Sequence, residues 1–345
     1  MSGSGCGSQS EEIRTGGKRR MAGKFQVSSS PHIRAKVTTS KIMLSVIIAL
    51  LPAALFGVWL NGPYAALILI LSIAAAVLTE YCYEKVTKGK ITISDGSAAL
   101  TGLLLGMNMP PRIAWWMPVL GSVFAILVVK QFFGGLGQNF MNPALAGRCF
   151  LMLSFAGSMT NFDVAGSAAN KIVDTVSGAT PLAAIKAGET GNLLSMFLGT
   201  TKGTIGETSA LLLLIGGIFL ICTKVISPRI PLVYLGTFAV FALIFGGRGF
   251  DLYYIACELC GGGIMLGAFF MATDYVTRPI TVKGQYVYAV ILGVMTGIFR
   301  IFGGSAEGTS YAIIFTNLLV PLIERATIPA GFGVVREKKK GGDAA

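Results

Sequence analysis

Apolar residues fill most of the chain and are interrupted by short polar connections. A helix needs about 20 apolar residues, with a range of about 17–25, to cross the hydrocarbon core of a membrane. Several runs reach this length once flanking Lys, Arg and aromatic residues are placed at the interface. The pattern therefore predicts an all-α polytopic membrane protein with about ten transmembrane helices. The ten charge-free runs are 42–60, 64–79, 96–111, 113–129, 149–162, 208–223, 230–247, 259–273, 284–299 and 308–323.

Two of these runs, 96–111 and 259–273, are short and rich in glycine and other small residues. Backbone N–H and C=O groups freed at a helix break are tolerated at membrane depth only where protein or a cavity covers them. These two runs therefore predict broken or re-entrant half-helices.

Similar glycine motifs occur in the two halves of the chain. The Phe-Gly-Gly motif at 133–135 recurs at 302–304, and Gly102 of the first short run corresponds to Gly267 of the second, at offsets of 169 and 165 residues. Each repeat would hold five spans, and an odd number inverts the second copy. Many transporters place a site at the midplane of such an inverted five-plus-five repeat. Chance recurrence of glycine in a glycine-rich membrane protein is the alternative.

The basic residues are distributed unevenly between the two sides of this predicted topology. Of the 28 Lys and Arg residues, 21 lie on the side that holds both termini and 6 lie on the opposite side, with Arg148 at the start of a span. Cytoplasmic loops carry such an excess of Lys and Arg. Both termini are therefore predicted to be cytoplasmic, in a multi-pass protein of the cell (inner or cytoplasmic) membrane.

The composition agrees with a membrane location. Hydrophobic residues make up 53% of the chain and charged residues only 13%, compared with about 25% charged residues in an average soluble domain. This balance excludes a disordered chain and an ordinary soluble domain. The net charge of +12 is accounted for by the topology, and no basic stripe is interleaved with aromatic residues, so no nucleic-acid partner is predicted.

The loop between the fifth and sixth runs is extracytoplasmic in this topology and contains the heptapeptide Asp174-Thr175-Val176-Ser177-Gly178-Ala179-Thr180. Small neighbours leave the Thr180 hydroxyl accessible, and Gly178 permits unusual backbone angles. A modification site is one interpretation. The other is an ordinary loop in which Thr180 caps a helix that begins at Pro181.

Stretches across the whole membrane part carry a family resemblance. The chain from about residue 30 resembles the D subunit of the Rnf-type ion-translocating electron-transport complex and, more distantly, the B subunit of the Na+-translocating NADH:quinone reductase. The short polar N-terminal segment favours the former. The supporting stretches are 30–32, 95–105, 110–111, 115–116, 134–139, 265–270, 273–274, 276–277, 302–304, 317 and 321–323.

The resemblance implies that a flavin transferase esterifies FMN to Thr180, within a motif that also contains Asp174, Ser177, Gly178 and Ala179. It implies a second, non-covalent flavin (riboflavin) among the helices. The partners would be the other subunits of an Rnf-type complex, which links reduced ferredoxin and NAD and moves Na+ or H+ across the lipid bilayer. A flavin needs orientation and electronic tuning from its protein.

Four acidic residues, Asp95, Glu258, Asp274 and Glu307, lie at or within ends of the predicted broken helices. Charged groups at membrane depth are costly and often mark ion or proton paths. The same residues are equally compatible with helix caps or loop positions. No metal centre is predicted. Side chains that could offer oxygen to Na+, or form interhelical hydrogen bonds, are Asn139, Asn142, Thr273 and Asn317.

The sequence thus predicts five segments: a polar cytoplasmic segment (1–40), a first five-helix repeat (41–156), an extracytoplasmic loop with the flavin site (157–206), a second five-helix repeat (207–325) and a basic cytoplasmic tail (326–345). A rival interpretation is a non-redox channel or secondary transporter, in which the external loop is only a lid. Flavin on the chain distinguishes the two.

Overall fold

The structure is a computed structural model, and it describes residues 37–89, 91–162, 181–186, 191–201, 203–248, 250–303 and 308–329. The chain divides into two units, Met1–Val37 and Thr38–Ala345, and the second is described below. Asp174, the Ser177-Gly178-Ala179-Thr180 motif and Glu307 lie outside the described residues.

The described residues are helical, with connecting turns. The first half contains α1 (Thr39–Asn61), α2 (Pro63–Val86), the 3-10 turn η1 (Ile93–Asp95), α3 (Ser97–Met107), α4 (Trp116–Phe124), the π-helical segment η2 (Ala125–Gln131) and α5 (Pro143–Ser154). α6 (Ala156–Met159) overlaps the start of the predicted external loop, which contains α7 (Pro181–Lys186) and α8 (Leu193–Leu198). The second half contains α9 (Ala210–Cys222), α10 (Arg229–Phe245), α11 (Leu252–Cys260), α12 (Ile264–Leu266), the π-helical segment η4 (Gly267–Met271), α13 (Val282–Gly297), the π-helical segment η5 (Ile298–Phe302) and α14 (Thr309–Thr327).

Each of the ten predicted apolar runs overlaps a helix of the structure. Within the described ranges, three helical segments are long and apolar enough to cross a membrane: Thr39–Asn61, Pro63–Val86 and Val282–Phe302. A fourth is the pair Leu252–Cys260 and Ile264–Met271, which is bent by 68°. The break predicted in the run 259–273 is therefore confirmed. The other glycine-rich run forms the 11-residue α3 after a 3-10 turn.

Polar residues at the ends of the apolar runs set where several helices begin. Asn142 caps α5, because its Oδ1 accepts from the backbone N–H groups of Ala144 and Leu145 and Pro143 occupies the first turn. Asp251 caps α11 in the same way. Side-chain oxygens satisfy the N–H groups that a helix start leaves free, so these caps fix the helix boundaries.

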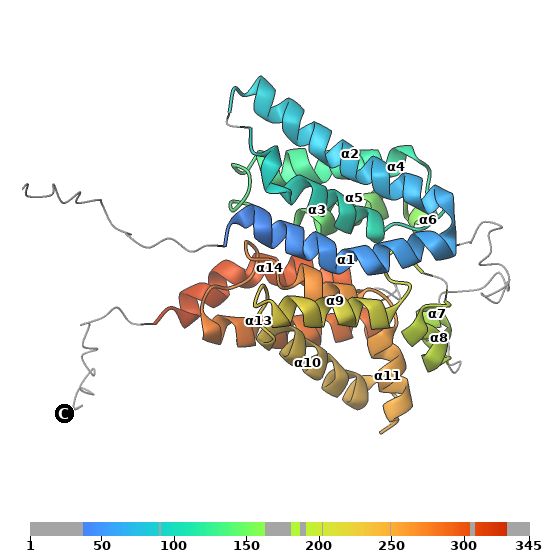
Figure 1. Cartoon of the computed structure of the whole chain (residues 1–345). Coiled ribbons are helices and arrows are strands. Elements are labelled where there is room, and N and C mark those ends of the chain that lie inside the picture. Colours follow the sequence, from blue (N-terminus) through green and yellow to red (C-terminus); the bar gives the residue numbers. More distant parts are fainter. Residues whose placement is uncertain are drawn as a thin grey trace, which may run out of the picture. The chain divides into compact units, whose positions relative to one another are not determined.

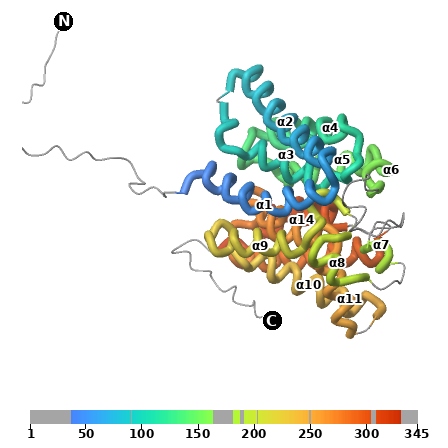
Figure 2. Tube along the Cα trace, turned by 45° about the vertical axis from the view of Figure 1, so that its right-hand side comes forward, coloured from blue at the N-terminus to red at the C-terminus, as the bar shows by residue number. Residues whose placement is uncertain are grey.

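The two halves pack side by side in both views (Figures 1 and 2), with α2–α5 on one side of α1 and α9, α10 and α13 on the other. Within the halves, α2 packs on α3 and α4, and α10 packs on α13. Helix α1 packs on α9, and α5 packs on α14, across the junction. One extended hydrophobic core joins residues from both halves.

Helices α2 and α3 approach each other closely at Gly102. A Cβ atom at this position would lie 2.7 Å from the Cα of Ile73 and 2.7 Å from the carbonyl oxygen of Ser72. The Ser72 hydroxyl donates to the carbonyl oxygen of Gly102 at 2.7 Å. Small residues allow helix backbones to approach in this way in membranes.

The two ends of the described bundle differ. The start of α1 and the end of α14 lie at the left of Figure 1, whereas α6, α7 and α8 lie at the right, and Figure 2 shows the same separation. Helices α7 and α8 contact α11 through a small hydrophobic cluster that includes Ile185, Met196 and Ile255. The predicted external loop therefore contains packed helices. One of them, α7, begins at Pro181, as one of the two interpretations of the heptapeptide expected, whereas α8 was not predicted.

Candidate functional site

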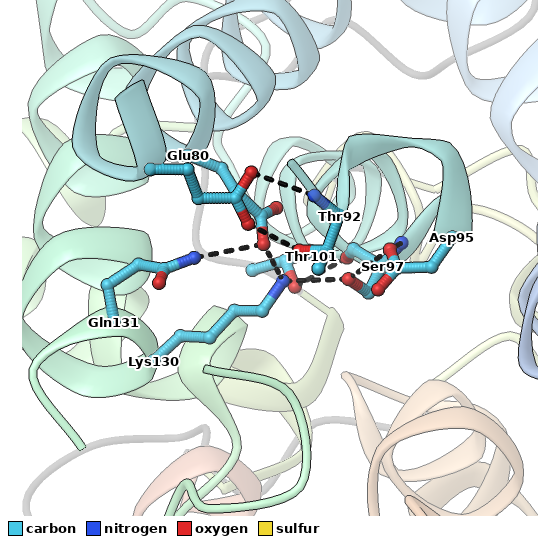
Figure 3. Close-up of polar contacts among 8 residues, drawn as sticks. Glu80, Thr92, Asp95, Ser97, Thr101, Lys130 and Gln131 are labelled. Atoms are coloured by element: carbon cyan, nitrogen blue, oxygen red, sulfur yellow. Dashed lines mark hydrogen bonds and ion pairs between the residues drawn. The ribbon is translucent and has the colours of Figure 1, made fainter. Parts of the chain in front are cut away.

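A buried polar cluster lies between α2, α3 and η2 (Figure 3). The Lys130 ammonium donates to Glu80 Oε1 at 2.7 Å and to Ser97 Oγ at 2.7 Å. Gln131 Nε2 donates to the same Glu80 oxygen at 3.0 Å. Glu80 is 1% exposed and Lys130 2%, while Glu80 Oε2 is buried and has no hydrogen-bond partner. The cluster is therefore a desolvated ion pair with one unused acceptor.

The cluster continues toward the start of α3. Asp95 Oδ1 accepts from the Ser97 backbone N–H at 2.8 Å and from Ser97 Oγ at 2.6 Å. Ser97 thus connects the Asp95 carboxylate to the Lys130 ammonium. On the same side Glu84 accepts from the backbone N–H of Thr92 at 2.9 Å and fixes the turn before η1. Gly96 is the N-cap of α3, and Asp95, one residue earlier, accepts from the N–H of the first helical residue, Ser97. Asp95 therefore has a structural role at the start of α3, which is one of the alternatives for this residue in the sequence.

A cavity of about 60 Å³ lies beside this cluster, between the two halves. Its first-half lining includes Ser97, Thr101, Lys130 and Asn139, and its second-half lining includes Asp274. Asn139 Oδ1 is buried without a hydrogen-bond partner. The cavity therefore brings an unused amide oxygen, a carboxylate and an ammonium to one place.

Asp274 lies in the connection between η4 and α13. Burial raises the pKa of this carboxyl above its usual range, and the opposing influences include the Thr277 hydroxyl and the Arg278 guanidinium. Thr277 Oγ1 donates to Asp274 Oδ2 at 3.2 Å. A carboxyl of this kind exchanges a proton at a higher pH than an exposed aspartate.

A second buried ion pair lies in a different part of the bundle, beside α7. Arg300 Nη1 lies 3.2 Å from Glu258 Oε2, and Arg300 Nη2 donates to the carbonyl oxygen of Gly261 at 3.0 Å. The pair lines a pocket of about 290 Å³, together with Lys186 of α7 and Arg248. This pocket and the Asp274 cavity share no lining residue, so Glu258 and Asp274 belong to separate sites.

A third buried pair joins the halves. Arg148 Nη1 on α5 donates to Asn108 Oδ1 at 2.7 Å, to Ser310 Oγ of α14 at 3.0 Å and to Glu207 Oε1 at 3.3 Å. Arg148 and Glu207 are both buried. This arginine ties three separate segments together, which is a structural role.

The four acidic residues predicted for an ion path therefore do not form one group. Asp274 lines the cavity between the halves, Asp95 reaches that cavity through Ser97, Glu258 lines the other pocket, and Glu307 lies outside the described residues. Among the oxygen donors suggested by the sequence, Asn139 and Asn142 line the cavity.

Sequence reasoning missed the basic partners. Lys130 and Arg300 were counted among loop charges that report topology, but both are buried and ion-paired at the ends of apolar helices. That part of the charge interpretation is wrong, although the imbalance between the two sides remains without them. The sequence feature that could have identified them is that each follows a long apolar run directly, Lys130 after 113–129 and Arg300 after 284–299.

The long apolar helices, the bent helix pair and the ion pairs buried among helices define a helical membrane protein. Within that class the chain belongs to the NQR2, RnfD, RnfE family, whose profile matches residues 26–333.

Relatives in this family cover almost the same length. The chain is 50% identical over 319 residues, which are 91% of this chain and 97% of the relative, to the D subunit of the Na(+)-translocating ferredoxin:NAD(+) oxidoreductase complex of Acetobacterium woodii. It is 45% identical over 90% of this chain and 97% of the relative to the D subunit of the proton-translocating ferredoxin:NAD(+) oxidoreductase complex of Clostridium ljungdahlii. It is 33% identical over 90% of this chain and 98% of the relative to the D subunit of the ion-translocating oxidoreductase complex of Escherichia coli K12.

Proposed function

We propose that this chain is the membrane-embedded D subunit of an ion-translocating ferredoxin:NAD+ oxidoreductase complex, in which it carries electrons on covalently bound FMN. The observation that carries the proposal is the 50% and 45% identity to D subunits over 97% of each relative's length. These identities favour the D subunit over the B subunit of the Na+-translocating NADH:quinone reductase. One of these relatives is named for Na+ and the other for protons, so both ions remain candidates.

The membrane topology in this proposal has ten spans in an inverted five-plus-five repeat. Two structural features support it. Helices α4 and α13 both continue into π-helical segments, η2 and η5. The Phe-Gly-Gly motif begins two residues after η2 in the first half and at the last residue of η5 in the second. The start of α1 and the end of α14 lie at one end of the bundle, as an even number of spans requires (Figure 1).

The orientation follows from the excess of basic residues in the segments on the side of the chain ends. That end would face the cytoplasm, and α6, α7 and α8 would face the extracytoplasmic side. A cysteine introduced in place of Ser195 on α8 should react with a membrane-impermeant maleimide added outside the cell. Labelling only from the cytoplasmic side would contradict the orientation.

The flavin site in this proposal is Thr180, together with Asp174, Ser177, Gly178 and Ala179. Thr180 directly precedes Pro181, the first residue of α7, and two residues later Leu182 lines the pocket of about 290 Å³. Small-molecule pockets usually start at about 300 Å³, and the basic and apolar lining suits an anionic aromatic group. When bound, FMN supplies one- and two-electron chemistry, and the chain binds and orients it.

The ion path in this proposal uses the cavity between the halves. Asp274 and Asn139 offer oxygen atoms, which hard cations prefer, and the raised pKa of Asp274 also suits proton transfer. Glu258 and Asp95 have structural partners and are weaker candidates, and Glu307 remains a prediction. The cavity of about 60 Å³ is too small for a flavin ring, so a riboflavin site would have to lie elsewhere among the helices.

Attachment of FMN is tested by in-gel fluorescence of the denatured chain, made together with its flavin transferase and partner subunits. The wild-type chain should show a fluorescent band, Thr180→Ala should lose it, and Thr175→Ala, in the same heptapeptide, should keep it. A band that persists in Thr180→Ala contradicts the attachment site. Absence of the band from the wild-type chain favours the non-redox channel or transporter.

A further inference from the structure

The cavity of about 60 Å³ between the halves has a positive charge in its wall. Among the described residues that line it, Lys130 and Asp274 are the two that carry a charge. An ammonium beside a candidate cation site is unexpected, because like charges repel. The ion pair with Glu80 does not by itself explain the lysine, since well-packed apolar residues of similar volume often stabilise a fold equally well. The position of Lys130 therefore indicates a role in the cavity.

The ammonium is held at the cavity wall by two contacts. Lys130 Nζ donates to Glu80 Oε1 and to Ser97 Oγ, each at 2.7 Å, and Lys130 is 2% exposed. Ser97 Oγ in turn donates to Asp95 Oδ1 at 2.6 Å. Figure 3 shows the Lys130 side chain pointing toward Glu80 and Ser97. The charge of Lys130 is therefore fixed in place, and it balances part of the negative charge of Glu80 and Asp95.

Two acceptor atoms in this region are unused. Glu80 Oε2 and Asn139 Oδ1 are buried and have no hydrogen-bond partner, and the two residues are 1% and 7% exposed. Asn139 lines the cavity together with Asp274. Carboxylate and amide oxygens are the ligands that Ca2+ prefers. Without the Lys130 charge, this region would offer two carboxylates and an amide oxygen to a divalent cation.

A fixed positive charge acts unequally on cations of different charge, because the Coulomb energy is proportional to the charge of the ion. A repulsion that weakens the binding of a monovalent cation about tenfold therefore weakens the binding of a divalent cation about a hundredfold. An ion path also needs binding that is weak enough for release. A divalent cation held between two carboxylates would leave slowly and block the path.

We propose that Lys130 determines the ion selectivity of the cavity, because its fixed ammonium keeps divalent cations out and leaves the site at Asp274 to one monovalent cation or proton. Glu80 and Ser97 are positioning residues, which hold the ammonium at the wall. The inference rests on the ion path proposed above and adds the residue that sets its selectivity.

The test uses the full-length chain in detergent and carbodiimide labelling of Asp274, followed by mass spectrometry of the peptide that contains it. Ca2+ and Na+ are the probes, and the concentration of each that halves the labelling measures its affinity. Lys130→Met should increase the affinity for Ca2+ about a hundredfold and the affinity for Na+ about tenfold. Lys130→Arg keeps the charge and should match the wild-type chain. Lys41→Met is the matched control, because Lys41 is exposed and does not line the cavity.

A second variant separates selectivity from folding. Glu80→Gln combined with Lys130→Met removes one charge of each sign, so its affinity for Ca2+ should return close to that of the wild-type chain. A merely structural loss would weaken the binding of both ions and would not favour Ca2+ over Na+. If Lys130→Met binds Ca2+ no more tightly than Lys41→Met, or if the double variant keeps the gain, only this inference is overturned. If Asp274→Asn leaves ion transport by the assembled complex unchanged, the proposed ion path itself fails.

Discussion

The buried Lys130–Glu80 pair gives the most direct test of the described fold. Lys130→Met keeps an unbranched side chain of similar length and removes the ammonium. Glu80 Oε1 would then keep only the Gln131 amide, at 3.0 Å, and Oε2 has no partner in either case. With 1% of Glu80 exposed, water cannot replace the lost charge without opening the packing of α2 against η2.

The cost can be estimated from buried ion pairs in general. Removing one partner of such a pair destabilises a protein by about 3–5 kcal/mol. The lower end, about 3 kcal/mol, applies here because Gln131 still donates to Glu80 Oε1. Removing both charges, in Glu80→Gln with Lys130→Met, leaves no uncompensated ion and should recover most of this loss.

Thermal unfolding of the full chain in detergent, followed by circular dichroism, measures the effect. With an unfolding entropy of about 2.1 cal/mol/K per residue, a chain of 345 residues shifts by about 1.4 °C per kcal/mol, so the single variant should unfold about 4 °C lower. Lys41→Met, at an exposed position in the first turn of α1, should change little. The reasoning is wrong if Lys130→Met matches Lys41→Met, or if the double variant is no more stable than Lys130→Met.

Three further results are expected. Carbodiimide labels a carboxyl only in its protonated form. Because burial raises the pKa of Asp274, its labelling should persist well above pH ~4. Labelling that ends near pH ~4 would contradict this burial. Gly102→Leu should destabilise the chain by about 1–3 kcal/mol or more in thermal unfolding, because its Cβ would meet the α2 backbone at Ile73. The control Gly236→Leu has open space around its Cβ position and should have a small effect. Asn142→Ala should cost about 1 kcal/mol through loss of the α5 cap, and Asn142→Asp should retain most of it; equal losses in the two variants would contradict the capping role.

The helices could be predicted from the sequence because hydrophobic periodicity and charge exclusion are local properties. All ten apolar runs overlap helices, and the glycines at 261–263 identified a broken helix correctly. The ion pairs could not be predicted, because their partners are far apart in the sequence. Glu80 and Lys130 are 50 positions apart, and Glu258 and Arg300 are 42. A single sequence contains no periodic signal that pairs such residues.

The candidate site shows the same division. The heptapeptide that ends at Thr180 could be singled out as a prediction because its residues are contiguous. The pocket of about 290 Å³ beside α7 could not be predicted. Its basic residues Lys186, Arg248 and Arg300 come from three separate segments, which meet only when α7 packs near α11. Lys186 and Arg248 were interpreted as ordinary loop charges, and their convergence is a property of the tertiary structure.

The π-helical segments have a consequence for how the chain can change in length. In η2 and η5 the backbone bonds connect residues five apart, as in Phe132 N–H to Leu127 O and Gly303 N–H to Ile298 O. Each such turn holds one residue more than an α-helical turn, so a one-residue deletion there would leave an ordinary α-helix. The same deletion would rotate the residues beyond it by about 100° and turn Lys130 or Arg300 away from its carboxylate. Conversely, inserting one residue into an α-helix at either turn would form the π-helical segment and rotate Lys130 or Arg300 toward its carboxylate. The helix would remain continuous.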